Sequence, residues 1–376
     1  MRIIARMNVG GPAVQVSGLM RGFNRSEFNQ RLFTGYCAED EADYLETVAK
    51  DVMAVRIQGF GRRVSLIGDL RSFISLVREI RLFKPDVIHT HTAKAGFLGR
   101  IASIISFQSS IRVHTFHGHL LAGYFGPYKR SLVVIIEKFL AIFTDQLLAV
   151  GDKVREDLLR AGIGSRSKFG LMPPGLKIGE LTSRDASRIA LALEPDQLQC
   201  AFIGRVTQIK RPDRFLDVVS ELKKRNVKLD FLMAGDGELL DRCRDRIMEE
   251  DLPVTILGWQ SDIERVLSAA DMVVLTSDNE GTPLSLIQAG MAGLPVVSTK
   301  VGSVPEVVLD GTTGIVTTLD VLEIANALEK LCRDKELRNR LGKAAQEFTL
   351  ANFGVHRLVQ DHEQLYKRLI ANRAKF

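Results

Sequence analysis

Residues 271–297, DMVVLTSDNEGTPLSLIQAGMAGLPVV, contain a complete strand, loop, helix and second strand. The apolar run Met272–Thr276 predicts a buried strand that runs into a polar loop. Thr282 is a typical helix N-cap, Pro283 suits the first helical position, and Gly293 is placed to end the helix before the next strand. A strand, a crossover helix and a second strand predict two parallel neighbours in an α/β sheet.

The same alternation occupies both halves of the chain. Helices are predicted from Ala13 to about Phe23 and over Leu66–Phe83. We therefore expect an α/β protein with two doubly wound, Rossmann-like domains. Besides the two runs above, the apolar runs that predict parallel strands are RIIARM, RLFTGY, VMAVRI, DVIHTHT, IRVHTFH and DQLLAVG in the first half and CAFIGRV, DFLMAGDG, VTILGW and TGIVTT in the second.

The domain boundary is expected after KFGLMPPGL. A chain of 376 residues exceeds the size of one ordinary core, so two domains are expected. We assign 1–176 to the first domain, 177–198 to a polar, low-order linker and 199–354 to the second domain. The C-terminal helix 355–376 is expected to join the first domain.

Composition excludes several classes of protein. Hydrophobic residues make up 45% of the chain and charged residues 26%, which excludes a disordered or fibrous protein. The four cysteines form no CxxC pair, so neither a disulfide scaffold nor a structural zinc site is expected. The most apolar stretch, SLVVIIEKFLAIFTDQLLAV, carries three charged residues and predicts a buried helix, not a membrane span. The short apolar run in MRIIARM does not resemble a signal peptide, and we expect a cytoplasmic protein.

The net positive charge lies in the first half. Residues 1–176 hold 24 Lys and Arg against 15 Asp and Glu, a balance of +9, whereas the remainder carries −3. A basic half fits an anionic partner such as a phospholipid surface, and a solvated basic face explains it equally well. No nucleic-acid-binding motif is present, so no nucleic acid partner is expected. The residues that would dock on lipid headgroups are Arg100, Arg112, Lys129 and Arg130, with Tyr124, Phe125 and Tyr128 among them.

Ligands of open α/β sheets bind at the carboxyl ends of the strands, where several residues stand out. Gly10 and Gly11 follow the first strand and would let the backbone approach an anion, although a tight turn also explains them. Arg205 and Lys210 follow a second-half strand and form a cation pair suited to a diphosphate.

The loop and helix within 271–297 add further candidates. The amides of Glu280, Gly281 and Thr282 are expected at a positive helix end that suits phosphate. Gln288 lies one turn beyond Ser285 and can point at a ligand, unless it is an ordinary solvated residue.

Six motifs together resemble the family 4 glycosyltransferases of the GT-B fold, which are retaining enzymes that use nucleotide sugars. They are GGP at Gly10, HTH at His89, HTFHGH at His114, GRVTQIK at Gly204, GDGE at Gly235 and EGTPLSLIQAG at Glu280. The resemblance covers nearly the whole chain, and the set is specific where each motif alone is weak.

The resemblance implies a role for each matching residue. Arg205 and Lys210 would hold the donor diphosphate, Gly11 would approach it from the other domain, and Glu280 would bond the hydroxyls of the donor sugar. His117 would lie near the reacting carbon, although alone it would more often be a structural residue. The family has a second acidic residue where this chain has Gln288, whose amide can still bond the ribose hydroxyls.

The resemblance also implies the reaction. It predicts transfer of a hexose from a UDP-sugar, such as UDP-glucose, to a saccharide or polyprenyl-linked acceptor during synthesis of a cell-surface polysaccharide. The first domain would bind the acceptor and the second the donor. No strict DxD and no ligand set at metal spacing is present, so we expect no metal and no further cofactor.

Three other functions fit parts of the pattern. A dehydrogenase is disfavoured because no GxGxxG follows the first strand. A nucleotide-sugar 2-epimerase shares the two-domain fold and would act on the donor without an acceptor. A non-catalytic nucleotide-sugar-binding protein would keep Arg205 and Lys210 but would not need Glu280 or His117.

Overall fold

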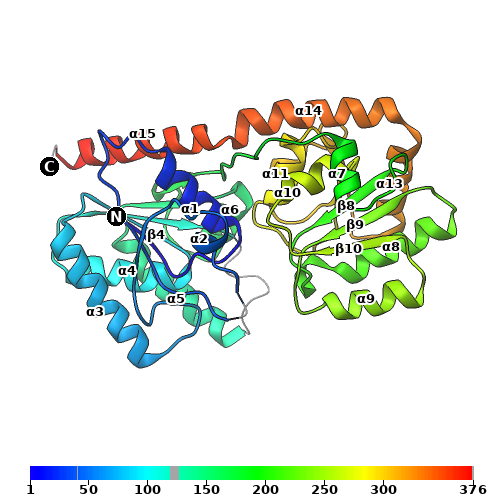
Figure 1. Cartoon of the computed structure of the whole chain (residues 1–376). Helices are drawn as coiled ribbons and strands as arrows, with labels where there is room; N and C mark the ends of the chain where they lie inside the picture. Colours follow the sequence, from blue (N-terminus) through cyan, green and yellow to red (C-terminus); the bar gives the residue numbers. More distant parts are fainter. Residues whose placement is uncertain (40, 119–126, 375–376) are drawn as a thin grey trace. The chain divides into compact units, whose positions relative to one another are not determined.

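The computed structural model describes residues 1–39, 41–118 and 127–374, and only the backbone of 127–129. The chain divides into two compact units (Figure 1). Unit 1 comprises Met1–Leu176 together with Phe353–Phe376, and unit 2 comprises Lys177–Asn352. The C-terminal helix therefore packs in the unit where the chain begins.

Unit 1 is built on a parallel sheet in the order β3-β2-β1-β4-β5-β6-β7. The winding direction reverses between β1 and β4, as in a doubly wound sheet. Helices cover both faces, which explains why the strands are nearly continuous apolar runs. The strands are β1 (Arg2–Ile4), β2 (Leu32–Thr34), β3 (Ala54–Arg56), β4 (Val87–His91), β5 (Ile111–Phe116), β6 (Gln146–Ala149) and β7 (Phe169–Leu171).

The helices of unit 1 form two layers (Figure 1). Helices α3, α4 and α5 pack next to one another on one face of the sheet. Helices α1, α2 and α15 cover the other face, where α15 packs against α1. The bounds are α1 (Gly11–Gly22), α2 (Tyr44–Thr47), α3 (Leu66–Phe83), α4 (Ala93–Ile105), α5 (Pro127–Ile142), α6 (Asp152–Arg160), the short 3₁₀ helix η1 (Arg166–Lys168) and α15 (Val355–Arg373).

Unit 2 repeats this architecture with a parallel sheet in the order β10-β9-β8-β11-β12-β13. Its main core lies between the sheet and helices α8, α9 and α13, where the Phe215 ring packs against those of Phe202 and Phe231. The strands are β8 (Gln199–Ile203), β9 (Asp230–Ala234), β10 (Val254–Gly258), β11 (Met272–Leu275), β12 (Val296–Thr299) and β13 (Gly314–Thr317).

The opposite face of the second sheet carries α7, α10 and α11. Helix α11 packs on β11 and β12, the two strands that it connects. The bounds are α7 (Arg184–Ala190), η2 (Gln208–Lys210), α8 (Pro212–Lys224), α9 (Leu240–Glu249), α10 (Ile263–Ala269), α11 (Leu284–Met291), α12 (Val304–Val307), α13 (Val321–Arg333) and α14 (Lys335–Phe353).

The two doubly wound sheets confirm the predicted fold class, and every apolar run assigned to a strand is a strand. The prediction of a low-order linker is wrong, because residues 177–198 belong to unit 2 and contain α7. Arg188 anchors this helix: it is buried and donates to the carbonyls of Ala269, Pro195 and Gln197 and to the Asp271 carboxylate. A buried arginine gives no apolar signal, so the sequence pattern did not reveal the helix.

The expectation of a buried helix around residue 135 is also wrong for one face of α5. Leu132, Ile135, Phe139 and Ile142 are each more than half exposed. Among the described residues, no helix is both long and apolar enough to cross a membrane.

Arg100 does not belong to an exposed basic surface, which corrects its predicted role in lipid docking. It is 1% exposed, and its Nη2 donates to both oxygens of Glu137 at 2.6 and 2.8 Å. Arg112 is also engaged, because its Nε donates to the carbonyl of Phe143. Arg130 is exposed. Tyr124, Phe125 and the side chains of Tyr128 and Lys129 lie outside the described residues.

Candidate active site

The carboxyl ends of β8 and β11 meet at the edge of the second sheet because the two strands are parallel neighbours. Thr276, just past β11, donates its hydroxyl to the carbonyls of Lys210 and Arg211 at 3.1 Å. The Asp278 amide donates to the carbonyl of Ile209 at 2.9 Å. These bonds fix the loop that contains η2 on the loop that follows β11.

Lys210 and Glu280 are brought together by this arrangement. The Lys210 Nζ lies 2.5 Å from Glu280 Oε1, although the two residues are 70 positions apart in the sequence. The Ser277 hydroxyl donates to the same oxygen at 2.5 Å. Glu280 is only 8% exposed, and burial of a carboxylate is tolerated where a cation and a hydroxyl compensate the lost hydration.

The loop after β12 holds the backbone of Glu280. The Ser303 amide donates to the Glu280 carbonyl at 3.2 Å, and the Thr299 hydroxyl donates to the carbonyl of Ser277 at 2.8 Å. Gly302 adopts φ +51°, and a Cβ there would lie 1.7 Å from the Glu280 carbonyl oxygen. The roles of Ser277, Gly302 and Ser303 were not predicted from the sequence, although Ser277 could have been found from its place directly past the predicted strand Met272–Thr276.

Arg205 differs from Lys210 in having no partner within the part of the chain that the structure describes. Its side chain is exposed and makes no hydrogen bond or ion pair with any other described residue. It lies two residues past β8, in the loop that leads to Lys210. The backbones of β8 and β9 approach closely here, since a Cβ on Gly235 would lie 1.8 Å from the carbonyl oxygen of Gly204.

Helix α11 begins later than predicted. Pro283 is its N-cap and Leu284 its first residue, so Thr282 is not the cap, and Gly281 and Thr282 lie in the preceding loop. Proline fits the N-cap because it needs no donor there. Gln288 lies on this helix, is partly exposed, and its side chain makes no hydrogen bond within the described part of the chain. The neighbouring Leu286 and Ile287 are buried in the core.

The other two candidate residues, Gly11 and His117, belong to unit 1. Gly11 is the first residue of α1, and the carbonyl of the N-cap Gly10 accepts the amides of Ala13 and Val14. His117 directly follows β5 and is partly exposed.

His117 lies at the end of a cluster of buried imidazole rings, those of His89, His91 and His362. His91 Nδ1 lies 2.9 Å from His117 Nε2, and His91 stacks on His89 with ring centroids 4.2 Å apart. Burial lowers the pKa of His117 to about 4 and that of His362 to about 3. Burial also places the pKa values of His89 and His91 well below 6.5, so the rings are neutral near pH 7.

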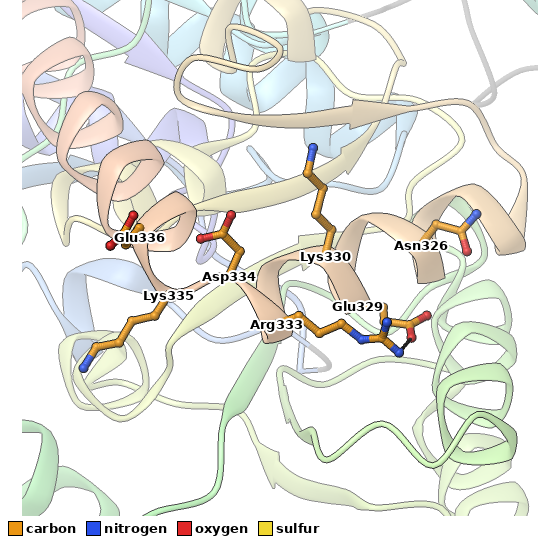
Figure 2. A pocket seen from close by; sticks show the side chains of 7 residues that line it. All are labelled: Asn326, Glu329, Lys330, Arg333, Asp334, Lys335 and Glu336. Carbon is orange, nitrogen blue, oxygen red and sulfur yellow. Dashed lines mark hydrogen bonds and ion pairs between the residues drawn. The ribbon is translucent and has the colours of Figure 1, made fainter.

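Neither a metal centre nor a second ligand site emerges elsewhere in the described parts of the chain. Residues 1–39, 41–118 and 127–374 contain no cluster of three or more His, Cys, Asp or Glu side chains that could hold a metal ion. A hollow of about 720 Å³ lies at the junction of α13 and α14 (Figure 2). The positive and negative side chains that line the hollow are equal in number, and Arg333 pairs with Glu329. The lining therefore favours neither an anionic nor a cationic ligand. It is lined by Asn326, Glu329, Lys330, Arg333, Asp334, Lys335 and Glu336.

Two family models match successive parts of the chain. The model described as glycosyl transferase 4-like domain matches residues 10–175, and the model described as glycosyl transferases group 1 matches residues 183–348. Each match falls within one of the two units.

Individual proteins are similar over nearly the full length. The UDP-Gal:alpha-D-GlcNAc-diphosphoundecaprenol alpha-1,3-galactosyltransferase of Escherichia coli is 27% identical, covering 96% of this chain and 97% of its own. The capsular polysaccharide biosynthesis glycosyltransferase CapM of Staphylococcus aureus is 22% identical, covering 82% and 83%. The crystal structure of Anabaena HepE in complex with UDP superposes with a TM-score of 0.82 at 19% identity, covering 98% and 99%.

The fold and the paired charges at the strand ends define a two-unit α/β enzyme, and the family matches complete the assignment. The chain belongs to the GT-B glycosyltransferases of family 4, as its motifs predicted, and it is a glycosyltransferase. This membership favours glycosyl transfer over the epimerase and the non-catalytic binding protein.

The neutral histidines predict that unit 1 loses stability in mild acid. The unfolded chain binds more protons than the folded chain below pH 6.5, so the free energy of unfolding falls as the pH drops from 6.5 towards 4. Each histidine contributes up to about 1.4 kcal/mol per pH unit. Hydrogen exchange of the β4 and β5 amides, corrected for intrinsic rates, measures this free energy.

His362→Asn should reduce the pH slope of this free energy by about one proton. His356→Asn serves as the control, because His356 is exposed and should leave the slope unchanged. A slope that is equal in wild type and His362→Asn would contradict the prediction.

Proposed function

We propose that the protein is a retaining hexosyltransferase that moves a hexose from a UDP-sugar to a saccharide or polyprenyl-linked acceptor during cell-surface polysaccharide synthesis. The contact between Lys210 and Glu280 is the observation that carries this proposal. It places a cation suited to phosphate beside a carboxylate suited to sugar hydroxyls, as the junction between a hexose and its diphosphate requires.

The relatives support the choice of substrates. The E. coli relative is named for a UDP-galactose donor and an undecaprenyl-diphosphate-linked acceptor, and CapM is named for capsular polysaccharide synthesis. The HepE structure contains UDP. The E. coli name describes formation of an α-1,3 bond. Transfer from an α-linked UDP-sugar to an α-linked product retains the anomeric configuration.

In the proposed reaction the bond between the sugar C1 and the β-phosphate oxygen breaks and a bond from C1 to the acceptor oxygen forms. The acceptor hydroxyl gives its proton to the departing phosphate on the same face of the sugar. Arg205 and Lys210 stabilise the negative charge that develops on the diphosphate, so no metal is required. Glu280 accepts hydrogen bonds from sugar hydroxyls, Gln288 bonds the ribose, and the loop amides at Gly281 and Thr282 together with Gly11 contact the phosphates.

A transfer assay with UDP-glucose, UDP-galactose and their N-acetyl forms tests this function. With a polyprenyl-diphosphate-linked sugar as acceptor, we expect one donor to give an α-linked disaccharide and UDP, with turnover unchanged in excess EDTA. NMR of the product identifies the anomer. A β-linked product would contradict retention, and loss of turnover in EDTA with rescue by magnesium would contradict the metal-free mechanism. Formation of an epimerised donor without acceptor would indicate the epimerase instead.

Calorimetric titration with UDP tests the donor contacts. Arg205→Ala and Lys210→Ala should each weaken binding by about 1.5 to 3 kcal/mol, the typical contribution of a charge-assisted hydrogen bond. Gln288→Glu should tighten binding several-fold, because a carboxylate bonds hydroxyls more strongly than an amide. Lys223→Ala is the control, since Lys223 is an exposed residue of α8 that pairs with Asp251.

Arg205→Ala gives the cleaner result, because Arg205 has no partner among the described residues, whereas loss of Lys210 leaves Glu280 buried without its cation. The thermal midpoint of each variant separates the two effects. Wild-type affinity for UDP in the Arg205 and Lys210 variants would exclude these residues from the donor site.

We further propose that α3 and α5 contact an anionic membrane. Ile67, Leu70 and Ile74 form an exposed stripe along α3, and Leu132, Ile135 and Phe139 form one along α5. The exposed charged residues of these helices within the described chain are all basic, among them Arg71, Arg78, Arg130 and Lys138. Apolar side chains flanked by cations are complementary to a bilayer with anionic headgroups.

Vesicle sedimentation tests the membrane contact. Binding to vesicles with anionic lipid should exceed binding to neutral vesicles and should decrease with salt. Ile135→Glu should weaken binding about tenfold, because it places a charge on the apolar face. Ile189→Glu, at a residue of α7 that is 79% exposed, is the matched control. Equal binding of both variants would contradict the proposal, and a dimer that only Ile135→Glu dissociates would identify a protein partner instead.

A further inference from the structure

A contact between His91 and His117 joins the buried imidazole cluster to the histidine that the proposed function assigns to the donor sugar. Their strands β4 and β5 pair in parallel, with His91 opposite Thr115. Alternation places His89 and His91 on the same face of the sheet, towards α15, and His117 continues the alternation that begins at Thr115. The contact of 2.9 Å between His91 Nδ1 and His117 Nε2 thus follows from strand register.

The surroundings hold the His91 ring in one plane. It stacks on His89, whose Nδ1 lies 2.5 Å from the Tyr366 hydroxyl and whose Nε2 lies 2.7 Å from the Thr115 hydroxyl. Both nitrogens of His89 are therefore satisfied, and its ring cannot flip without losing a hydrogen bond.

Charges near the cluster favour the neutral state of every ring. Arg2 faces His89, His91 and His362, is 3% exposed and lies over the rings of Phe23 and Tyr366. Arg357 is a second cation that lowers the pKa of His362. His114 faces the opposite side of the sheet, where it bonds Thr90 and lies near Arg100. Among residues 1–39, 41–118 and 127–374, no acidic side chain raises the pKa of His89, His91 or His117.

When two neutral imidazoles are in contact, one of the two contacting nitrogens carries a proton and donates the hydrogen bond, and the other nitrogen accepts that bond. His91 Nε2 is buried and has no partner among the described residues. If this nitrogen carried the proton, a buried N–H would be unpaired, which proteins avoid more strictly than an unpaired acceptor. The His91 proton therefore belongs on Nδ1, where it is donated to His117 Nε2. The His117 proton then belongs on Nδ1, the nitrogen without a partner in the described chain.

We propose that His91 is a positioning residue that fixes the tautomer and ring plane of His117, so that His117 presents an Nδ1–H donor to the ligand. The ligand-binding part of this inference rests on the proposed function, in which His117 lies at the donor sugar. His117 then donates a hydrogen bond to a sugar oxygen and does not act as a base.

Nitrogen NMR of protein labelled with ¹⁵N-histidine tests the tautomer without any substrate. We expect a protonated Nδ1 and a bare Nε2 for His117 in wild type, assigned by comparison with His117→Ala. His91→Phe keeps the ring and its stacking but removes the donor, so His117 should shift towards the Nε2–H form. His91→Asn offers an amide donor at the place of Nδ1 and should preserve the wild-type tautomer.

His114→Leu is the matched control, because His114 is as buried as His91 but faces the other side of the sheet. It should leave the His117 tautomer unchanged, even if stability falls. A protonated Nε2 on His117 in wild type, or the same tautomer in wild type and His91→Phe, would overturn the proposal.

Kinetics complete the test. His91→Phe should lower kcat about tenfold or more with the KM of the donor within about twofold, and His91→Asn should recover most of kcat. If the tautomers respond as expected while His117→Ala retains full turnover, the proposed role of His117 at the sugar is wrong, and its orientation by His91 stands. Full turnover of His91→Phe together with an active role of His117 would overturn the positioning role.

Discussion

A buried carboxylate, Glu280, is the group on which the carboxyl edge of the second sheet depends. A carboxylate that loses its hydration costs several kcal/mol unless donors replace the water. Lys210 and Ser277 supply these donors, and each must be held in place. Thr276 holds the loop of Lys210, and Gly302 allows the loop after β12 to approach the Glu280 backbone. The loops that follow β8, β11 and β12 are therefore held together around the Glu280 carboxylate.

The sheet of unit 1 differs from that of unit 2, because it buries imidazole rings without counter-charges. The imidazoles remain neutral because burial disfavours protonation and Arg2 adds to that effect. The rings of His89 and His91 are then placed by hydrogen bonds to hydroxyls or to another ring, and Tyr366 brings one of these hydroxyls from α15. His362 bonds the backbone carbonyl of Leu358. The C-terminal helix thus completes the polar core of the unit in which the chain begins.

The sequence predicted the fold and every strand except β7, because burial on both faces makes parallel strands continuous apolar runs. Helix α3 also matches its predicted bounds, since Ser65 caps its start and Lys84 ends it in a left-handed conformation. The apolar face of α5 was missed, because composition does not tell which side of a helix faces solvent. For the site, the residue types were predicted, but the contact between Lys210 and Glu280 was not, since it depends on loops 70 positions apart.

The proposed reaction develops charge of both signs, and the side chains proposed for it come from both units. In that reaction negative charge develops on the leaving diphosphate, and Arg205 and Lys210 of unit 2 are the cations proposed to stabilise it. Positive charge develops at the sugar carbon, as in other glycosyl transfers. A cationic histidine at that carbon would repel the developing charge, whereas a neutral imidazole can donate a hydrogen bond to a sugar oxygen without that penalty. Burial of the histidine cluster keeps His117 neutral, which is the form that a positively charged sugar carbon tolerates in the proposed reaction. The same burial lowers the stability of unit 1 in acid.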